Sequence, residues 1–380
     1  MKKKLIPLAL LLIISLLVVG CGPAVSEDVA ELQAEIAERN AEITKLKGEI
    51  TQLKAGEPIE PIAWRVSYWG GPGSTPESFQ YWADEMEART DGRFTAEIHF
   101  GGVLAPGPEG IDGVRAGLFE MAHVFTNWHP GKTPLSEGFT LPFIGPSGQK
   151  QLFMWEQMIN AHPYMVDEFG EWNARIDILP IAAGIFEIMS EAPISSTDDF
   201  DGLRMEVGGL QGEAFIAFGA VPTDFEIPEM YEAHDKGLID ANCGGWPGLF
   251  GMLSLYELLP YATVGVSPGT VHPVWMVNVD AWDALPDEVK GVQWDEVKPQ
   301  MIDKTIEITN VVNDGYFAKM DAQGVQISDF PASEREKLIG VSAATWDRWA
   351  SEKDADGLPG TEFVQLLRTA SAWAQAGWSD

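Results

Sequence analysis

The fold class is decided by Trp64-Arg65-Val66-Ser67-Tyr68-Trp69, which is followed by Gly70-Gly71-Pro72-Gly73 and then by Thr75–Arg89. The first six residues favour a β-strand, and the run of glycine and proline predicts a sharp turn. The third segment predicts a helix capped by Ser74 or Thr75, because its apolar residues recur at helical spacing: Phe79, Trp82, Ala83 and Met86. A strand, a turn and a helix in this order are typical of α/β proteins.

The same alternation continues along the chain. We expect strands over residues 94–100, 119–125, 203–207 and 271–279, and a strand-rich stretch over 176–189. We expect helices over residues 109–116, 152–169, 211–218 and 286–323. Within the last of these, Pro299 either kinks the helix or starts a second one. This order predicts α/β sheets that are divided over two lobes.

Ligands of open α/β sheets bind beyond the carboxyl ends of the strands, where loops and helix N-termini meet. In this chain those ends are the segments after Trp69, Phe125 and Val207, together with the stretch Asn242–Trp246. The binding residues are therefore expected in these four places.

Composition narrows the functional classes. The chain has 380 residues, 45% of them hydrophobic, so it can form two lobes with substantial cores. Its formal net charge of −32 repels phosphate backbones, which excludes nucleic acid as a main partner. Cys21 and Cys243 are its only cysteines, so no disulfide framework and no cysteine-based metal cluster is expected.

The N-terminus has the pattern of a lipoprotein signal. Met1–Lys4 is basic, Leu5–Val19 is almost wholly apolar, and Gly20 precedes Cys21. This apolar run is too short for a permanent membrane span, so we interpret residues 1–20 as a signal peptide. Cys21 would then carry lipid, which predicts an extracytoplasmic protein anchored to a membrane.

Residues 21–55 have a heptad pattern, which predicts a helical stalk. The pattern is set by Val29, Leu32, Ile36, Arg39, Ile43, Leu46, Ile50 and Leu53. β-Branched residues alternating with leucine favour a parallel coiled coil of two helices, and hence a homo-oligomer. Because the pattern is so short, a single helical stalk is the alternative. Residues 56–61 contain Gly56, Pro58 and Pro61 and are interpreted as a linker.

The motifs of enzymes are poorly matched. Gly265-Val266-Ser267-Pro268-Gly269 fits Gly-x-Ser-x-Gly, but Pro268 and a strand-like segment stand where the helix after a nucleophile is required. The only later histidine is His272. The six histidines show no zinc-binding spacing. The sequence therefore predicts no enzymatic activity and no cofactor.

Short motifs occur in a fixed order between Trp64 and about Val341. They are Thr90-Asp91-Gly92-Arg93-Phe94, Gly113-Val114-Arg115-Ala116-Gly117, Leu141-Pro142-Phe143, Asp199-Phe200-Asp201-Gly202-Leu203-Arg204-Met205, Phe218-Gly219-Ala220-Val221-Pro222, Pro228-Glu229-Met230-Tyr231-Glu232-Ala233 and Lys236-Gly237-Leu238-Ile239-Asp240-Ala241, followed by Asn278, Trp282 and Leu285-Pro286. Through them the chain resembles the solute-binding proteins of tripartite ATP-independent periplasmic (TRAP) transporters. Gly208-Gly209 and Asp240-Ala241 resemble the branch that binds monocarboxylates, namely 2-oxo or 2-hydroxy acids, with a metal ion.

The resemblance implies a two-lobed, periplasmic-binding-protein-like α/β fold, often called a Venus flytrap, with a long interlobe helix. It also implies that the lobes close over one small solute, which passes unchanged to TRAP membrane permease subunits. The expected ranges are residues 62–185 with 272–285 for the first lobe, 186–271 for the second, and 286–380 for the long helix and the C-terminal helices.

Two positions depart from the family pattern. Most members have an arginine in a Gly-Leu-Lys-x-Arg run that clamps the solute carboxylate, whereas here the run ends at Glu206. A glutamate that often contacts solute or metal is replaced by Cys243. The usual set of anion and metal ligands is therefore incomplete, and a solute-bridging metal ion has no support in these residues.

Two interpretations of the departures remain open. Arg204, on the same strand face as Glu206, takes over the clamp, or the solute is neutral or cationic and meets an acidic site with aromatic walls. We favour the second. The predicted binding residues are Trp69, Asn127, Trp128, Glu187, Arg204, Glu206, Asn242, Cys243 and Trp246. A receptor for an ATP-driven (ABC-type) importer and a sensing or scaffold lipoprotein are the alternative functions.

Overall fold

The computed structural model describes residues 39, 41–43, 45, 61–129, 131–181, 184–223, 225 and 227–376. The chain divides into two units, Met1–Glu60 and Pro61–Asp380. The predicted signal peptide, Cys21 and nearly all of the linker lie outside the described residues. Of the predicted stalk only residues 39, 41–43 and 45 are described, and they are helical.

The first sheet of the larger unit has five strands in the order β2-β1-β3-β10-β4. β1 is parallel to β2 and β3, whereas β10 is antiparallel to β3 and β4. The strands are β1 (Ile62–Ser67), β2 (Phe94–His99), β3 (Met121–Phe125), β4 (Ala174–Arg175) and β10 (Pro273–Asn278). The first three come from one end of the chain, and β10 returns to them from a distant segment.

The second sheet has six strands in the order β11-β9-β5-β8-β6-β7. β6 is parallel to β7 and β8, and β5 is antiparallel to β8 and β9. The strands are β5 (Phe186–Ser190), β6 (Arg204–Val207), β7 (Val221–Thr223), β8 (Ala241–Gly245), β9 (Tyr261–Val264) and β11 (Gln326–Asp329). The expected α/β class with two sheets is thus confirmed.

Helices cover both faces of the first sheet. On β10, Val274 and Met276 join a core with residues of helices α5 and α14, while Trp275 and Val277 join a core with residues of α3. Alternate residues of a strand point to opposite faces, so a strand that is apolar throughout must be covered on both. The helices that follow the strands are α3 (Ser74–Arg89), α4 (Gly110–Arg115), α5 (Gln149–Asn160), α6 (Pro163–Gly170), α7 (Gly212–Ile216), α8 (Met230–Asp235) and α9 (Gly248–Met252).

Two predicted elements differ in the structure. The helix expected over residues 152–169 is divided into α5 and α6, because Pro163 stands in the first turn of α6 and disfavours helical geometry at His162 before it. The stretch 176–189, expected to be strand-rich, has regular strand only from Phe186, where β5 begins. Its earlier part is the segment by which the chain crosses from the first sheet to the second.

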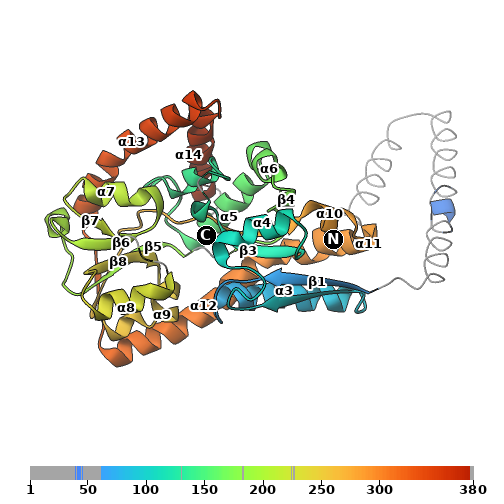
Figure 1. Cartoon of the computed structure of the whole chain (residues 1–380), viewed down its shortest axis with the longest axis horizontal. Coiled ribbons are helices and arrows are strands. Elements are labelled where there is room, and N and C mark those ends of the chain that lie inside the picture. The colour runs from blue at the N-terminus through green and yellow to red at the C-terminus, as the bar shows by residue number, and fades with distance from the viewer. Residues whose placement is uncertain are drawn as a thin grey trace, which may run out of the picture. The chain divides into compact units, whose positions relative to one another are not determined.

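A long helical segment links the two sheets. After α10 (Val279–Asp283), it comprises α11 (Asp287–Gly291), a π-helical turn (Val292–Val297) and α12 (Lys298–Gln323). Pro299 lies in the first turn of α12, directly after the π-helical turn, so it stands where α-helical geometry resumes within one continuous helical segment. Met301 packs in a core of the first sheet and Met320 in a core of the second. Figure 1 shows α12 running from α3 to α8 and α9.

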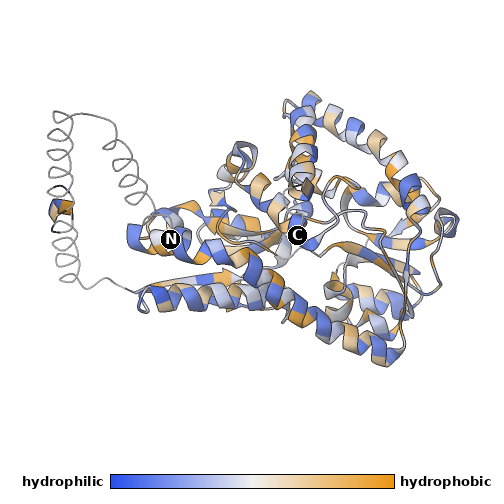
Figure 2. Ribbon diagram, turned by 180° about the vertical axis from the view of Figure 1, so that it is seen from behind, coloured by the Kyte–Doolittle hydropathy of each residue, from blue (hydrophilic) through white to orange (hydrophobic). Residues whose placement is uncertain are grey.

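The C-terminal helices form a second bridge. In α13 (Ala332–Ala355), Leu338 packs in the core of the second sheet and Trp349 in that of the first. α14 (Gly360–Ala376) returns against α13 and packs on α5. Hydrophilic and hydrophobic residues alternate along these helices in Figure 2, as expected for helices with one packed face.

Glu156 on α5 is a buried acid inside this core and provides a test of the packing. Its side chain is 2% exposed, and its Oε1 has no hydrogen-bond partner among the described residues. Burial raises the pKa of this carboxyl well above its ordinary value. The folded chain therefore holds the proton more tightly than the unfolded chain, and stability falls as the pH rises through the folded-state pKa.

We expect Glu156→Gln to raise the melting temperature at pH 8 by about 2–4 °C for each kcal/mol that ionisation of the buried acid costs. The gain should shrink towards zero near pH 5, where the carboxyl is protonated in the folded state. Calorimetric melting of both proteins at the two pH values measures this. Glu171→Gln, at an exposed acid, is the control. An equal gain at both pH values would contradict the argument.

Candidate functional site

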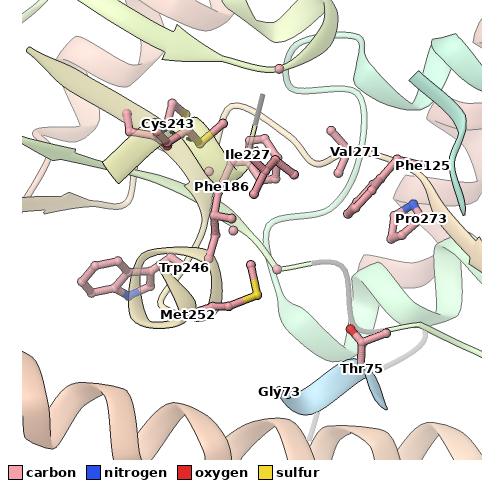
Figure 3. Close-up of a pocket in the computed structure, with 18 of the residues that line it drawn as sticks. Gly73, Thr75, Phe125, Phe186, Ile227, Cys243, Trp246, Met252, Val271 and Pro273 are labelled. Atoms are coloured by element: carbon pink, nitrogen blue, oxygen red, sulfur yellow. Dashed lines mark hydrogen bonds between the residues drawn. The ribbon is translucent and has the colours of Figure 1, made fainter. Parts of the chain in front are cut away.

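A cavity of about 530 Å³ lies between the two sheets. It is lined from the first sheet by residues at the ends of β1 and β3, and from the second by residues of β6 and β8. Helices α9 and α12 and the segments that cross between the sheets complete its walls. Figure 3 shows Phe125 and Pro273 on one side and Cys243, Trp246 and Met252 on the other.

The turn after β6 brings the second sheet close to the first lobe. Gly209 has a φ of 68°, and a Cβ added to it would lie 2.5 Å from the Cβ of Thr140. Only glycine fits this backbone and this contact. The next residue, Leu210, donates its N–H to Thr140 Oγ1 at 3.1 Å. The Gly208-Gly209 pair singled out in the sequence therefore lines the cavity at a point where the two lobes touch.

Glu206 is the only Asp, Glu, Lys or Arg among the described residues that line the cavity. Its side chain is 6% exposed. Its Oε2 accepts hydrogen bonds from Thr223 Oγ1 at 3.2 Å and from the backbone N–H of Phe225 at 3.1 Å. These contacts fix the carboxylate at the carboxyl end of β6.

Two residues of β8 lie beside this carboxylate. Asn242 pairs with Glu206 in the register of β8 and β6, and its side chain is 1% exposed. Its Nδ2 donates to Met230 Sδ at 3.3 Å, while its Oδ1 has no hydrogen-bond partner among the described residues. Cys243 is also buried, and burial raises the pKa of its thiol well above the ordinary value, so it lines the cavity as a neutral group.

Aromatic rings form the wall on the side of the first sheet. Trp128 lies edge-on to both Trp69 and Phe125, with ring centroids 5.3 and 4.9 Å away. Trp69 donates its Nε1–H to His123 Nδ1 at 2.9 Å, which fixes the indole. Burial lowers the pKa of His123 to about 3, so this imidazole is neutral at physiological pH.

The structure brings most of the predicted binding residues to one cavity: Trp69, Asn127, Trp128, Glu206, Asn242, Cys243 and Trp246. Two others lie away from it. Arg204 pairs with Asp240 and donates to the carbonyl oxygen of Gly237 at 2.7 Å. Glu187 accepts hydrogen bonds from the backbone N–H of Val266 at 2.9 Å and from Ser267 Oγ at 2.8 Å.

These contacts bear on two sequence interpretations. Arg204 is engaged by Asp240 outside the cavity, so the geometry does not offer it as a substitute clamp for a carboxylate. In the Gly-x-Ser-x-Gly match, the Ser267 hydroxyl is directed to Glu187, and the next regular element is strand β10 rather than a helix. The Glu187 contacts hold the segment that leads from β9 in the second sheet to β10 in the first, whereas the Arg204 contacts join the starts of β6 and β8.

Sequence reasoning missed several cavity residues, among them Phe186, Phe225, Asn313 and Tyr316. Phe186 precedes Glu187, and only the phase of β5 decides which of the two faces the cavity. Asn313 and Tyr316 are three residues apart on α12 and therefore share one face of it. The spacing of Asn313 and Tyr316 can be seen in the sequence, but no sequence pattern indicates that this face of α12 lines the cavity.

The residues do not fit a divalent metal ion of the calcium type. Such an ion takes six to eight oxygen ligands, with carboxylates prominent among them. Here Glu206 is the one carboxylate among the described lining residues, and a neutral thiol stands at Cys243. No group of three or more His, Cys, Asp or Glu side chains suited to a metal is present in the described part of the chain.

Two sheets joined by crossing segments and a long bridging helix, with a cavity of this size between them, define a two-lobed receptor for a small solute. The chain belongs to the bacterial extracellular solute-binding protein family 7 (DctP), whose model matches residues 72–353. It is therefore a TRAP-type solute-binding protein, as the sequence motifs indicated.

Similar proteins differ in the solutes they are named for. The monocarboxylate 2-oxoacid-binding periplasmic protein of Nostoc sp. is 28% identical over 55% of this chain, which spans 58% of that protein's length. The ectoine-binding periplasmic protein TeaA of Halomonas elongata is 25% identical over 70% of this chain, and the match covers 77% of the length of TeaA. A crystal structure of a TRAP solute-binding protein of Rhodoferax ferrireducens with copurified benzoate has 19% identity and a TM-score of 0.72. The match covers 83% of this chain and 99% of the Rhodoferax chain.

Proposed function

We propose that this protein captures a neutral or cationic small solute outside the cytoplasm and delivers it to a TRAP membrane permease. The observation that carries the proposal is the charge of the cavity, because Glu206 is the only Asp, Glu, Lys or Arg among the described residues that line it. Membership of the family supports transport, and the cavity supports this class of solute.

A carboxylate solute would meet no Lys or Arg side chain among the described residues that line the cavity. The nearest arginine in the sequence, Arg204, is paired with Asp240, and His123 is neutral. The positions of the larger unit that are undescribed between residues 61 and 376 are not basic in the sequence: Pro130, Ala182, Ala183, Asp224 and Glu226. Two like charges in a closed cavity repel by about 4 kcal/mol at 4 Å and an effective dielectric constant of 20.

The names of the similar proteins do not decide between solutes. One of them is named for 2-oxoacids and another for ectoine, at identities of 28% and 25%. Identity at this level leaves room for the exchange of a single residue that reverses the charge of a site. Glu206 is such an exchange, because it stands where the family pattern has an arginine.

We also propose that Cys21 carries lipid and that residues 21–55 hold the receptor away from the membrane. The support is the basic and apolar N-terminal run followed by Gly20-Cys21, and the heptad pattern after it. Whether the stalk is one helix or a pair follows from the oligomeric state of the full chain.

A thermal-shift panel tests the class of solute. Amines, guanidines, zwitterions, polyols and 2-oxo acids are each added to the purified protein at a range of concentrations. A solute at 100 times its Kd stabilises the folded state by about 2.7 kcal/mol, which is a measurable shift. We expect members of the cationic or neutral groups to raise the melting temperature and simple 2-oxo acids to leave it unchanged. Stabilisation by the 2-oxo acids alone would overturn the proposal.

A further inference from the structure

Resting on the proposed function, we infer that the solute is a cation with N–H groups, such as an ammonium, amidinium or guanidinium, and not a quaternary ammonium. Glu206 and Asn242 together receive this group on the second lobe, and Asn127 receives it on the first.

Glu206 and Asn242 stand side by side on the second sheet. They are direct partners in the parallel pairing of β6 and β8. Neighbouring strands are about 4.8 Å apart, and directly paired residues project from the same face of the sheet. Both side chains line the cavity. A carboxylate and a carboxamide therefore stand next to each other, spaced to receive two N–H groups from one solute.

Asn242 carries a buried acceptor for which the described residues supply no donor. The Nδ2 group donates to the Met230 sulfur at 3.3 Å, which sets the orientation of the amide, because the reverse orientation would place a carbonyl oxygen against the sulfur. Oδ1 consequently lies in the buried site, where none of the described residues donates a hydrogen bond to it. A buried acceptor that has lost water and found no donor costs free energy, so the site favours a solute that supplies one.

A third acceptor lies on the opposite lobe. Asn127, in the turn after β3, lines the same cavity, and its Oδ1 is buried without a hydrogen-bond partner in the described part of the chain. Acceptors on both walls suit a cation whose several N–H groups point in different directions. Such a solute would bind to both lobes and so favour their closure.

The aromatic wall argues against a quaternary ammonium. Binding sites for such cations surround the methyl groups with separated rings that form a cage. Here the centroids of Trp69, Phe125 and Trp128 lie 4.9–5.7 Å from one another. At these distances the rings pack against each other and present one surface rather than several sides of a cage. That surface can cover one face of a planar cation or the alkyl part of an amine.

The test uses the full chain and pairs of cations of similar size: n-butylamine and N-propylguanidine against n-butyltrimethylammonium. Calorimetry of the unaltered protein should show the N–H cations binding at least about tenfold more tightly, the equivalent of one charge-assisted hydrogen bond. Asn242→Leu keeps the branched shape and the number of heavy atoms of the side chain and removes the acceptor, so it should abolish most of this preference. Asn310→Leu, at an exposed position of α12, should retain it.

Asn242→Asp provides a second variant that keeps an acceptor, and it should retain or increase the preference for N–H cations. Equal binding of the trimethylammonium probe, or an unchanged preference in Asn242→Leu, would overturn this inference while leaving a cationic solute in place. Binding of 2-oxo acids and of none of the cations would instead overturn the proposed function.

Discussion

Glu206→Arg should exchange the charge selectivity of the receptor. Cations that bind the unaltered protein are expected to lose at least about 100-fold in affinity, because an attraction in a poorly solvated cavity becomes a repulsion. Small monocarboxylates should gain measurable binding, since a guanidinium at this position can pair with a carboxylate in a bidentate manner. Titration calorimetry with one amine and one 2-oxo acid measures both changes.

Glu206→Gln separates charge from shape. It keeps the side-chain length and an oxygen acceptor for Thr223 and Phe225, so the local hydrogen bonds have a partner. The loss of the charge alone should weaken cations by about 10- to 100-fold without admitting carboxylates. If neither variant changed the affinity for any solute, Glu206 would not contact the ligand, and the charge argument would fail.

Trp69→Ala is expected to have the second-largest effect, a loss of about 30-fold or more in solute affinity. The indole is fixed by its hydrogen bond to His123 and supplies apolar and π surface to the cavity. A desolvated cation–π contact contributes up to about 2 kcal/mol, and the lost apolar burial adds to it. Equilibrium binding of the best solute from the thermal-shift panel measures the change.

Two controls accompany Trp69→Ala. Trp69→Phe keeps a ring and should lose less affinity than the alanine variant. Trp373→Ala removes an indole that is 52% exposed on α14, away from the cavity, and should leave affinity unchanged. A loss of the same size in Trp373→Ala would indicate a general effect on the fold rather than on the site.

The architecture could be predicted from the sequence because each strand and helix has a recognisable pattern in its own residues. Strand-like runs that end in glycine, helices with regular apolar spacing and the long segment 286–323 each correspond to an element of the structure. The divided helix at Pro163 could also have been anticipated, since proline is tolerated in the first turn of a helix and not in its interior.

The site was predictable only in part, because it depends on contacts between distant segments. Arg204 does share the strand with Glu206, but Asp240, 36 residues away in sequence, pairs with it at the start of the strand. Likewise, the sequence does not tell which of Phe186 and Glu187 faces the cavity. The pairing of β5 with β8 and β9 decides this. No local pattern contains that information.

The position of β10 has a consequence for synthesis of the chain. β10 lies between β3 and β4, although it comes much later in the sequence. A nascent chain that has not reached Pro273 leaves β3 with an open edge and β4 without the partner it has in the finished sheet. Open strand edges invite pairing with other chains. The first lobe thus becomes complete only after most of the second has been translated, and a fragment that ends between the two is an aggregation-prone intermediate rather than half of a receptor.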